Sequence, residues 1–181
     1  MATKWKIDTA HSEIQFKVKH LMITTVTGHF RQFDLNVDTD SDDFTTAKKI
    51  EFTAEINSID TNNSQRDAHL KSADFFNAEE YSKLKFVGAK YEANDDEAKL
   101  YGDLTIKNIT RPVILNVEHG GIVDDPYGQT KAGFTVNGKI SRKDFGLTWS
   151  AVTEAGQVVV GDEIKIQAEV QLVKQAELVN A

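Results

Sequence analysis

Residues 13 to 20 alternate between polar and apolar side chains at every position. The apolar members are Ile14, Phe16 and Val18, and the intervening residues are charged or amide side chains. Successive side chains of a β-strand point to opposite faces, so this pattern predicts a strand with one apolar and one solvated face. His20 has the same parity as the apolar residues, and we expect it at the end of the apolar face.

The same alternation recurs along most of the chain and predicts an all-β fold. Further strands are predicted over 5–8, 33–37, 50–56, 83–91, 100–106, 112–117, 132–140 and 164–172, although the apolar residues of 83–91 mix both parities. Strands of up to about ten residues with a polar outer face favour a closed antiparallel barrel of about eight strands over a two-sheet sandwich. A barrel of that size can hold one small ligand. Without a linker-like stretch, residues 1–181 are predicted to form one domain.

Four segments interrupt the alternation. A short helix or structured crossover is predicted for residues 62–77. Irregular chain with a helical turn is predicted for residues 21–28. Gly120 and Gly121 predict a turn. The tail from residue 174 is predicted to be frayed or weakly helical.

Two glycines occupy inward positions on otherwise apolar strands. Gly102 and Gly138 share the parity of the apolar residues around them. A glycine at such a position leaves space for a ligand or lets the barrel bend, and we favour the bend.

Composition excludes several classes of protein. Net charge is −7, with 28 acidic and 21 basic residues, which disfavours binding to nucleic acid. The chain has no cysteine, so disulfides and thiolate chemistry are excluded. No apolar run is long enough to span a bilayer, and no leader is visible at the N-terminus. We therefore expect a cytoplasmic protein, or a periplasmic one if a leader has been removed.

Several short motifs together resemble one family. They include Gly28-His29-Phe30 and Arg66-Asp67-Ala68-His69-Leu70. Others are 5–8, 11–12, 16–21, 58–62, 74–76, 102–106, 110–113 and 141–147. In order and spacing the chain resembles the YceI-like family of lipid-binding proteins over nearly its whole length.

The resemblance implies an extended lipocalin-like barrel of eight antiparallel strands. It implies a polyisoprenoid or a fatty-acid-like amphiphile bound in a long apolar cavity, and it also implies a homodimer. Many members of the family carry a signal peptide and act in the periplasm, and this chain departs from them in showing none.

Apolar residues on the inward faces are the predicted contacts for the ligand's hydrocarbon chain. They are Ile14, Phe16, Val18, Phe30, Phe33, Phe52, Phe75, Phe86, Leu104, Phe134 and Val136. A charged head group would stay at the mouth or meet cationic donors, because it cannot leave water without partners. The candidate donors are His20, Arg66, His69, Lys71 and Arg142.

Arg66 and His69 are three residues apart and would share one face of a helical turn. An alternative role for Arg66 and Asp67 is a local ion pair or cap that pins the insert to the barrel.

Neither a metal site nor a catalytic site is indicated. The five histidines are scattered, and His11 is expected to make a structural hydrogen bond to Ser12 or Asp8. No Gly-x-Ser-x-Gly motif is present. We therefore expect a non-catalytic binding protein without a cofactor or metal. The alternatives are an isomerase or cyclase acting on a lipid in the same barrel, and a structural or partner-binding module with a solid core.

Overall fold

The structure is a computed structural model that describes residues 2–94, 97–149 and 159–176. It is built mainly of antiparallel strands, with one α-helix, α1 (Ser64–Lys71), in the described part of the chain. The strands are β1 (Thr3–Ile7), β2 (Glu13–His20), β3 (Thr24–Phe30), β4 (Phe33–Thr39), β5 (Lys49–Glu55), β6 (Ile59–Asp60), β7 (Lys83–Asn94), β8 (Glu97–Ile106), β9 (Ile109–Asp124), β10 (Thr130–Ser141) and β11 (Val160–Lys174). Short 3₁₀ turns are η1 (Thr9–His11), η2 (Phe44–Thr46), η3 (Ile56–Ser58) and η4 (Arg142–Phe145). None of these helical segments has the length and apolar character needed to cross a membrane.

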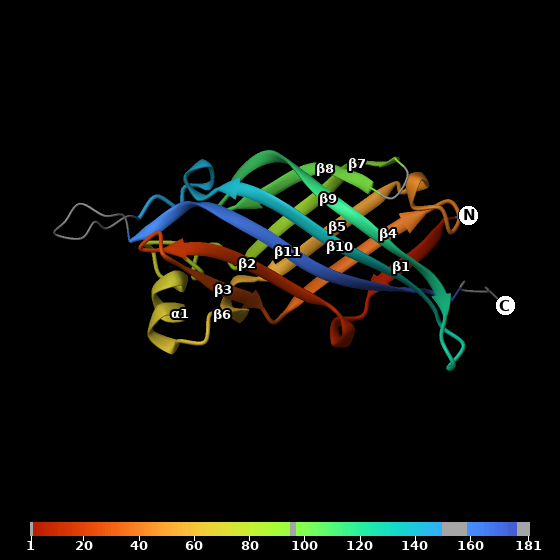
Figure 1. The fold of residues 1–181 in the computed structure, drawn as a ribbon, viewed down its shortest axis with the longest axis horizontal. Coiled ribbons are helices and arrows are strands. Elements are labelled where there is room, and N and C mark those ends of the chain that lie inside the picture. Colours follow the sequence, from red (N-terminus) through yellow and green to blue (C-terminus); the bar gives the residue numbers. More distant parts are fainter. Residues whose placement is uncertain (1, 95–96, 150–158, 177–181) are drawn as a thin grey trace.

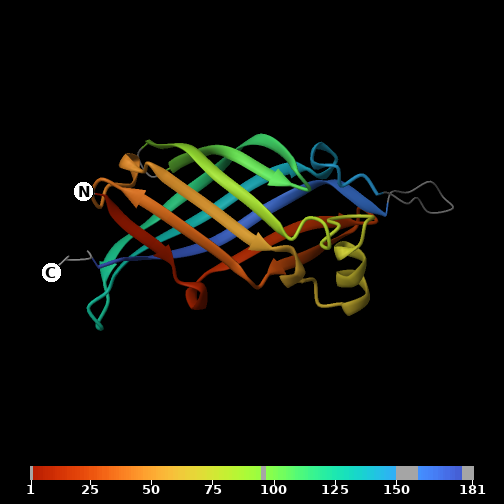
Figure 2. The ribbon, with the colours of Figure 1, turned by 180° about the vertical axis from the view of Figure 1, so that it is seen from behind.

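Eight strands form a closed, lipocalin-like ring. Their order is β1-β4-β5-β7-β8-β9-β10-β11, and pairing of β1 with β11 closes it. The N-terminal part of β11 pairs instead with β2, which is followed outward by β3 and β6. The predicted all-β barrel of about eight strands with a short helical insert is therefore confirmed. The barrel is elongated; α1 lies at one end, and the start of β1 and the end of β11 lie at the other (Figures 1 and 2).

The chain passes from β1 to β2 through η1, where β11 changes partners. Asp8 caps this turn by accepting from the Ala10 amide at 3.1 Å and by pairing with His11 Nδ1 at 2.8 Å. The expected structural role of His11 is thus confirmed, with Asp8 as its partner. Ser12 is buried, and its hydroxyl accepts from the Gln171 amide at 3.0 Å, which ties the kink to β11.

The structure corrects two local predictions. Much of the segment 21–28, expected to be irregular, belongs to β3, because its threonines are compatible with a strand without producing alternation. Gly120 and Gly121, expected to form a turn, lie within β9, where the register with β10 shifts. An extra residue in one strand forms a bulge, and glycine accommodates the required backbone geometry, here a φ of 121° at Gly121.

A second register shift explains the mixed parity of residues 83–91. The pairing of β7 with β8 shifts between Gly88 and Lys90. Leu84 and Phe86 face inward before the shift, and Tyr91 lines the interior after it. Val87, in contrast, is exposed on the outside.

The inward glycines make room for neighbouring side chains and not directly for a ligand. A Cβ atom on Gly102 would lie 2.5 Å from Phe86 Cζ and 2.5 Å from the Val87 carbonyl oxygen. At Gly138 the space is taken by Leu115. Large side chains thus lie flat across glycines of adjacent strands and form part of the barrel wall.

Changing Gly102 to alanine is expected to destabilise the fold by about 1–3 kcal/mol, because the added methyl group overlaps both an aromatic ring and backbone. Gly133→Ala is the matched control, since nothing lies within 4 Å of its added Cβ. The control should be neutral or slightly stabilising, because glycine is unfavourable in strands. Urea unfolding of the two variants measures the difference; equal stabilities would contradict this packing.

Candidate ligand-binding cavity

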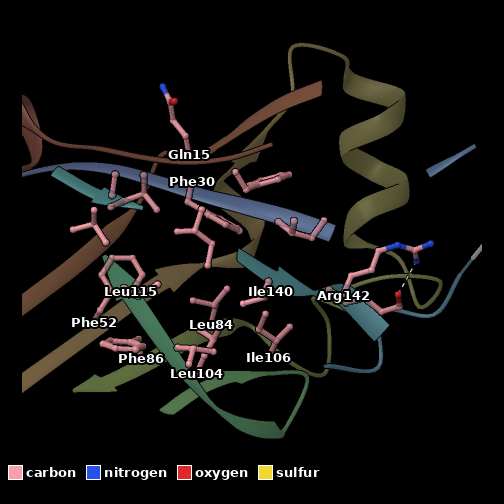
Figure 3. A pocket seen from close by; sticks show the side chains of 18 of the residues that line it. Gln15, Phe30, Phe52, Leu84, Phe86, Leu104, Ile106, Leu115, Ile140 and Arg142 are labelled. Carbon is pink, nitrogen blue, oxygen red and sulfur yellow. Dashed lines mark hydrogen bonds between the residues drawn. The ribbon is translucent and has the colours of Figure 1, made fainter. Parts of the chain in front are cut away.

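The barrel encloses an apolar cavity of about 220 Å³. All of its lining residues are apolar except Gln15 and Arg142. Of the residues predicted to bind a ligand, ten line it: Ile14, Phe16, Val18, Phe30, Phe52, Phe75, Phe86, Leu104, Val136 and Arg142. Figure 3 shows how those on β5, β7 and β8 converge on the interior from one wall.

Many inward side chains are not fully buried. Ile14, Phe16 and Val18 on β2, and Ile164 and Ile166 on β11, line the cavity yet are only half-buried. In a solid core these inward positions would be packed on all sides. Their partial accessibility agrees with the cavity that they line.

Aromatic side chains pack together at the end of the barrel that holds the start of β1. A smaller apolar cavity of about 80 Å³ continues from the main one and shares Val136 and Leu100 with it. Beyond it, Phe44 packs against Trp5 at 4.9 Å and against Phe134 at 4.8 Å between ring centroids. His119 stacks on Phe134 at 4.5 Å, and partial burial lowers the pKa of His119.

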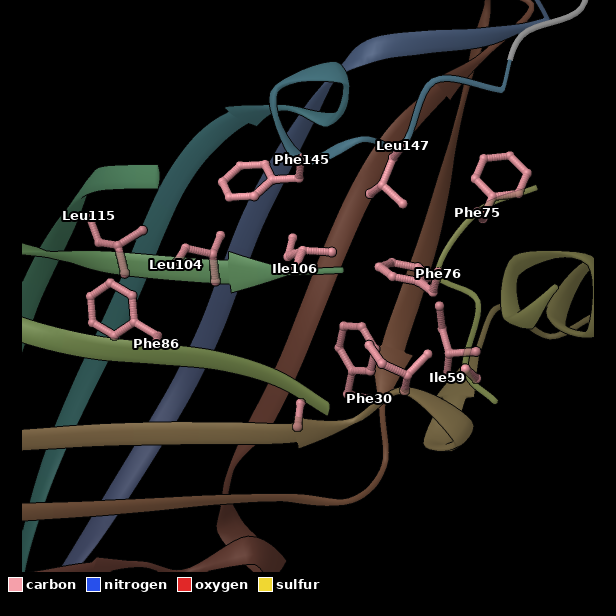
Figure 4. Close-up of a cluster of buried hydrophobic side chains, with 13 residues drawn as sticks. Phe30, Ile59, Phe75, Phe76, Phe86, Leu104, Ile106, Leu115, Phe145 and Leu147 are labelled. Atoms are coloured by element: carbon pink, nitrogen blue, oxygen red, sulfur yellow. The ribbon is translucent and has the colours of Figure 1, made fainter. Parts of the chain in front are cut away.

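At the opposite end, α1 and the segment after it cover the cavity. Leu70, Phe75 and Phe76 line the interior there, and Figure 4 shows Phe75 and Phe76 beside α1. The His69 ring lies edge-on to Phe75 at 5.1 Å and to Trp149 at 5.0 Å. We call this end of the barrel the mouth.

Arg142 closes one side of the mouth. Its side chain is only 2% exposed. Its guanidinium donates to the carbonyls of Gly161 at 3.0 Å, Leu147 at 2.7 Å and Trp149 at 2.6 Å. Burial lowers the pKa of Arg142, and the Asp162 carboxylate at 3.4 Å opposes that shift. Arg142 therefore joins η4 to the start of β11.

The other predicted head-group donors lie outside the cavity lining. His20, the last residue of β2, is exposed. Arg66 Nε donates to Thr61 Oγ1 at 2.8 Å, while Asp67 accepts from the Thr61 amide at 2.8 Å. This is the pinning of the insert that we considered as the alternative.

The remaining predicted residues divide between the mouth and two other cavities. His69 pairs with Asp74 at 2.9 Å, and Lys71 ends α1 without lining the cavity. Phe134 lines the smaller cavity, and Phe33 lines a polar pocket of about 490 Å³ around η1.

Sequence reasoning missed much of the wall formed by β11. Ile164, Ile166, Ala168 and Val170 all line the cavity. Their alternation was visible in the sequence, but it gave no reason to choose these residues as ligand contacts over the apolar residues of other strands. Gln15 lies on the polar face of β2, and its amide contacts His29 Nε2 at 3.0 Å and points away from the cavity (Figure 3).

Comparison with known proteins places the chain in a family. Residues 5–172 match the YceI-like domain. This chain belongs to the YceI-like family. A UPF0312 protein of Staphylococcus epidermidis is 41% identical over 172 residues, covering 93% of this chain and 96% of the relative. A UPF0312 protein of Staphylococcus aureus is 40% identical over the same shares.

Solved structures share the YceI-like fold. A YCEI protein of Campylobacter jejuni has a TM-score of 0.73 and 34% identity, covering 88% of this chain and 90% of its own. BcnA of Burkholderia cenocepacia has a TM-score of 0.78 at 21% identity, with 91% and 98% covered. A polyisoprenoid-binding domain from Saccharophagus degradans has a TM-score of 0.65 at 14% identity, with 94% and 98% covered. The last two establish likeness of fold alone.

Proposed function

We propose that this protein binds a long-chain polyisoprenoid, or a fatty-acid-like amphiphile, in its barrel and sequesters or carries it. The observation that carries the proposal is the hollow interior lined almost entirely by apolar side chains. Likeness of fold to a polyisoprenoid-binding domain supports the same class of ligand. The lining residues named above are the proposed contacts for the hydrocarbon chain.

Burial of hydrocarbon supplies enough free energy for such binding. Each buried methylene contributes roughly 0.8 kcal/mol, so about fifteen carbons contribute roughly 12 kcal/mol before the costs of association and ordering. Micromolar binding needs about 8 kcal/mol. No charged anchor inside the barrel is therefore required. Selectivity between ligands that differ in the length of the hydrocarbon chain should be low.

The head group is proposed to stay at the mouth, in contact with water. A phosphate or carboxylate would lose much free energy if it entered the apolar lining without partners. The Arg142 guanidinium, whose donors are directed at carbonyl groups, would brace the mouth and not anchor the ligand. His69 and Lys71 lie closer to solvent and are the better candidates for contact with an anionic head group.

Binding without turnover is the function that the lining favours. An isomerase or cyclase would need an acid or base beside the reacting carbons. The two polar residues of the described lining, Gln15 and Arg142, are engaged with His29 and with backbone carbonyls. We also expect a homodimer, which light scattering at several protein concentrations would test.

Native mass spectrometry of gently purified protein tests the proposed function. We expect additional mass that is released by organic solvent and identified as an isoprenoid or fatty chain. Protein stripped of lipid should take up geranylgeraniol or palmitate from dilute solution. Protein that is empty when isolated and that takes up neither probe would contradict the proposal.

A further inference from the structure

The turn between β2 and β3 presents two large apolar side chains to solvent. Met22 is 59% exposed and Ile23 is 76% exposed. We refer to Leu21, Met22 and Ile23 as the mouth hairpin tip. Single exposed apolar residues are common on protein surfaces, so the backbone, the position and the surrounding charge must decide whether this tip has a function.

The backbone of the tip is unfavourable for the residues it carries. Leu21 has a φ of 51° and Met22 a φ of 60°, and the Ile23 amide donates to the His20 carbonyl at 3.1 Å. This is a type I′ turn, for which Asn-Gly is the preferred pair. Bulky apolar residues rarely adopt positive φ. Turn formation therefore does not account for the side chains at this tip. Non-glycine residues with such unfavourable backbone angles cluster at functional sites.

The tip stands at the rim of the ligand cavity. Val18 and Val160 line the cavity, and His20, one residue before the tip, is paired with Val160. The Leu21 amide donates to the Val159 carbonyl at 2.8 Å, which fixes the tip to the start of β11. In Figures 1 and 2 this turn lies at the same end of the barrel as α1.

Three lysines gather on β2 and β11 next to the tip, in a protein that is acidic as a whole. Residues 14–33 contain no aspartate or glutamate, whereas the whole chain has a net charge of −7. Lys17 and Lys19 lie on β2, and Lys165 of β11 is directly opposite Lys17. Among the described residues none of these three lysines forms an ion pair, and nearby Asp162 is paired with Arg142 and Lys143.

The opposite end of the barrel provides the contrast. There Val123 and Tyr127 are 64% and 89% exposed, but they flank Asp124 and Asp125. A negatively charged surface would repel the two aspartates of this turn and attract the lysines beside the mouth hairpin tip. Exposure is thus similar at both ends, while charge and proximity to the cavity differ.

We propose that the mouth hairpin tip docks the barrel onto an anionic lipid bilayer, with Met22 and Ile23 inserted at the interface and Lys17 and Lys19 near the head groups. Docking there would place the mouth of the cavity against the membrane, where a lipid could pass between the two apolar phases. Shallow insertion of apolar side chains combined with basic residues is typical of reversible membrane binding. The lipid-transfer role rests on the proposed function, whereas docking can be measured without it.

Vesicle sedimentation tests the docking directly. Vesicles of equal parts phosphatidylcholine and phosphatidylglycerol should bind the protein, and vesicles of phosphatidylcholine alone should bind it more weakly. The variant Met22→Gly/Ile23→Thr should lower partitioning about ten-fold or more, because it removes the inserted apolar surface. Lys17→Gln and Lys19→Gln should each lower it about five-fold. The matched control, Val123→Thr/Tyr127→Ser, should bind vesicles as the unchanged protein does.

The same variant has a second signature. Glycine relieves the positive φ at position 22, so Met22→Gly/Ile23→Thr should melt at the same temperature as the unchanged protein or higher, which excludes unfolding as the cause of lost binding. Uptake of geranylgeraniol from solution should be unaffected. If the unchanged protein does not sediment with anionic vesicles, or if the tip and control variants behave alike, the docking proposal is wrong. Vesicle binding without uptake of geranylgeraniol would instead overturn the proposed function and leave docking in place.

Discussion

Replacement of Arg142 by leucine should destabilise the protein by about 3–5 kcal/mol, because several carbonyl groups beside its buried guanidinium would lose their donor. The guanidinium donates to the carbonyls of Leu147 and Trp149 and to that of Gly161 in β11, so it joins two segments of the chain. For a chain of this size the melting temperature should fall by about 10 °C or more. Urea unfolding followed by tryptophan fluorescence measures the effect.

Lys143→Leu is the matched control for this prediction. Lys143 is the next residue and also pairs with Asp162 at 3.4 Å, but its side chain is 51% exposed. An exposed ion pair contributes less than about 1 kcal/mol. If Arg142→Leu were as stable as Lys143→Leu while losing affinity for anionic lipids alone, Arg142 would be a head-group anchor and not a brace.

Filling the lumen should abolish ligand binding while the fold is retained. Val136 lines both the main cavity and its smaller continuation, so Val136→Trp places an indole where the hydrocarbon chain would pass. We expect affinity for geranylgeraniol to fall about thirty-fold or more, corresponding to about 2 kcal/mol of lost burial. Fluorescence titration with a displaceable fatty-acid probe measures the change.

The control for lumen filling is Ile114→Trp. Ile114 is 54% exposed on the outer face of β9, so its replacement adds the same side chain without entering the cavity. It should bind geranylgeraniol as the unchanged protein does. Unchanged affinity in Val136→Trp, with the fold intact, would mean that the ligand lies elsewhere.

The sequence predicted the barrel because alternation is a local property of each strand. The inward faces of β2, β5, β8 and β10 follow directly from parity. Parity gives the side of a strand but not how far a side chain is covered, so it placed His20 at the end of the apolar face and could not show that His20 is exposed. Register shifts, as after Gly88, depend on the neighbouring strand and disturb parity without a clear local signal.

The role of Arg142 could not be predicted, for a different reason. A charged residue in a polar segment predicts a solvated surface, or at most a head-group donor. Its burial depends on the carbonyl groups of Leu147, Trp149 and Gly161, which the tertiary fold brings to its guanidinium. The role of Gly102 also depends on a neighbouring strand, because the ring that occupies the space beside it is that of Phe86 on β7.

The central claim is that the apolar lumen holds a hydrocarbon chain, and methyl NMR during titration with geranylgeraniol tests it most directly. Methyl signals of Ile14, Leu104 and Ile166, which line the cavity, should shift strongly and saturate at a single stoichiometry. Methyl signals of Val87 and Ile114, exposed on the outer wall, should not move. Shifts confined to the outer methyl groups, or none at all with soluble ligand in excess, would contradict the account.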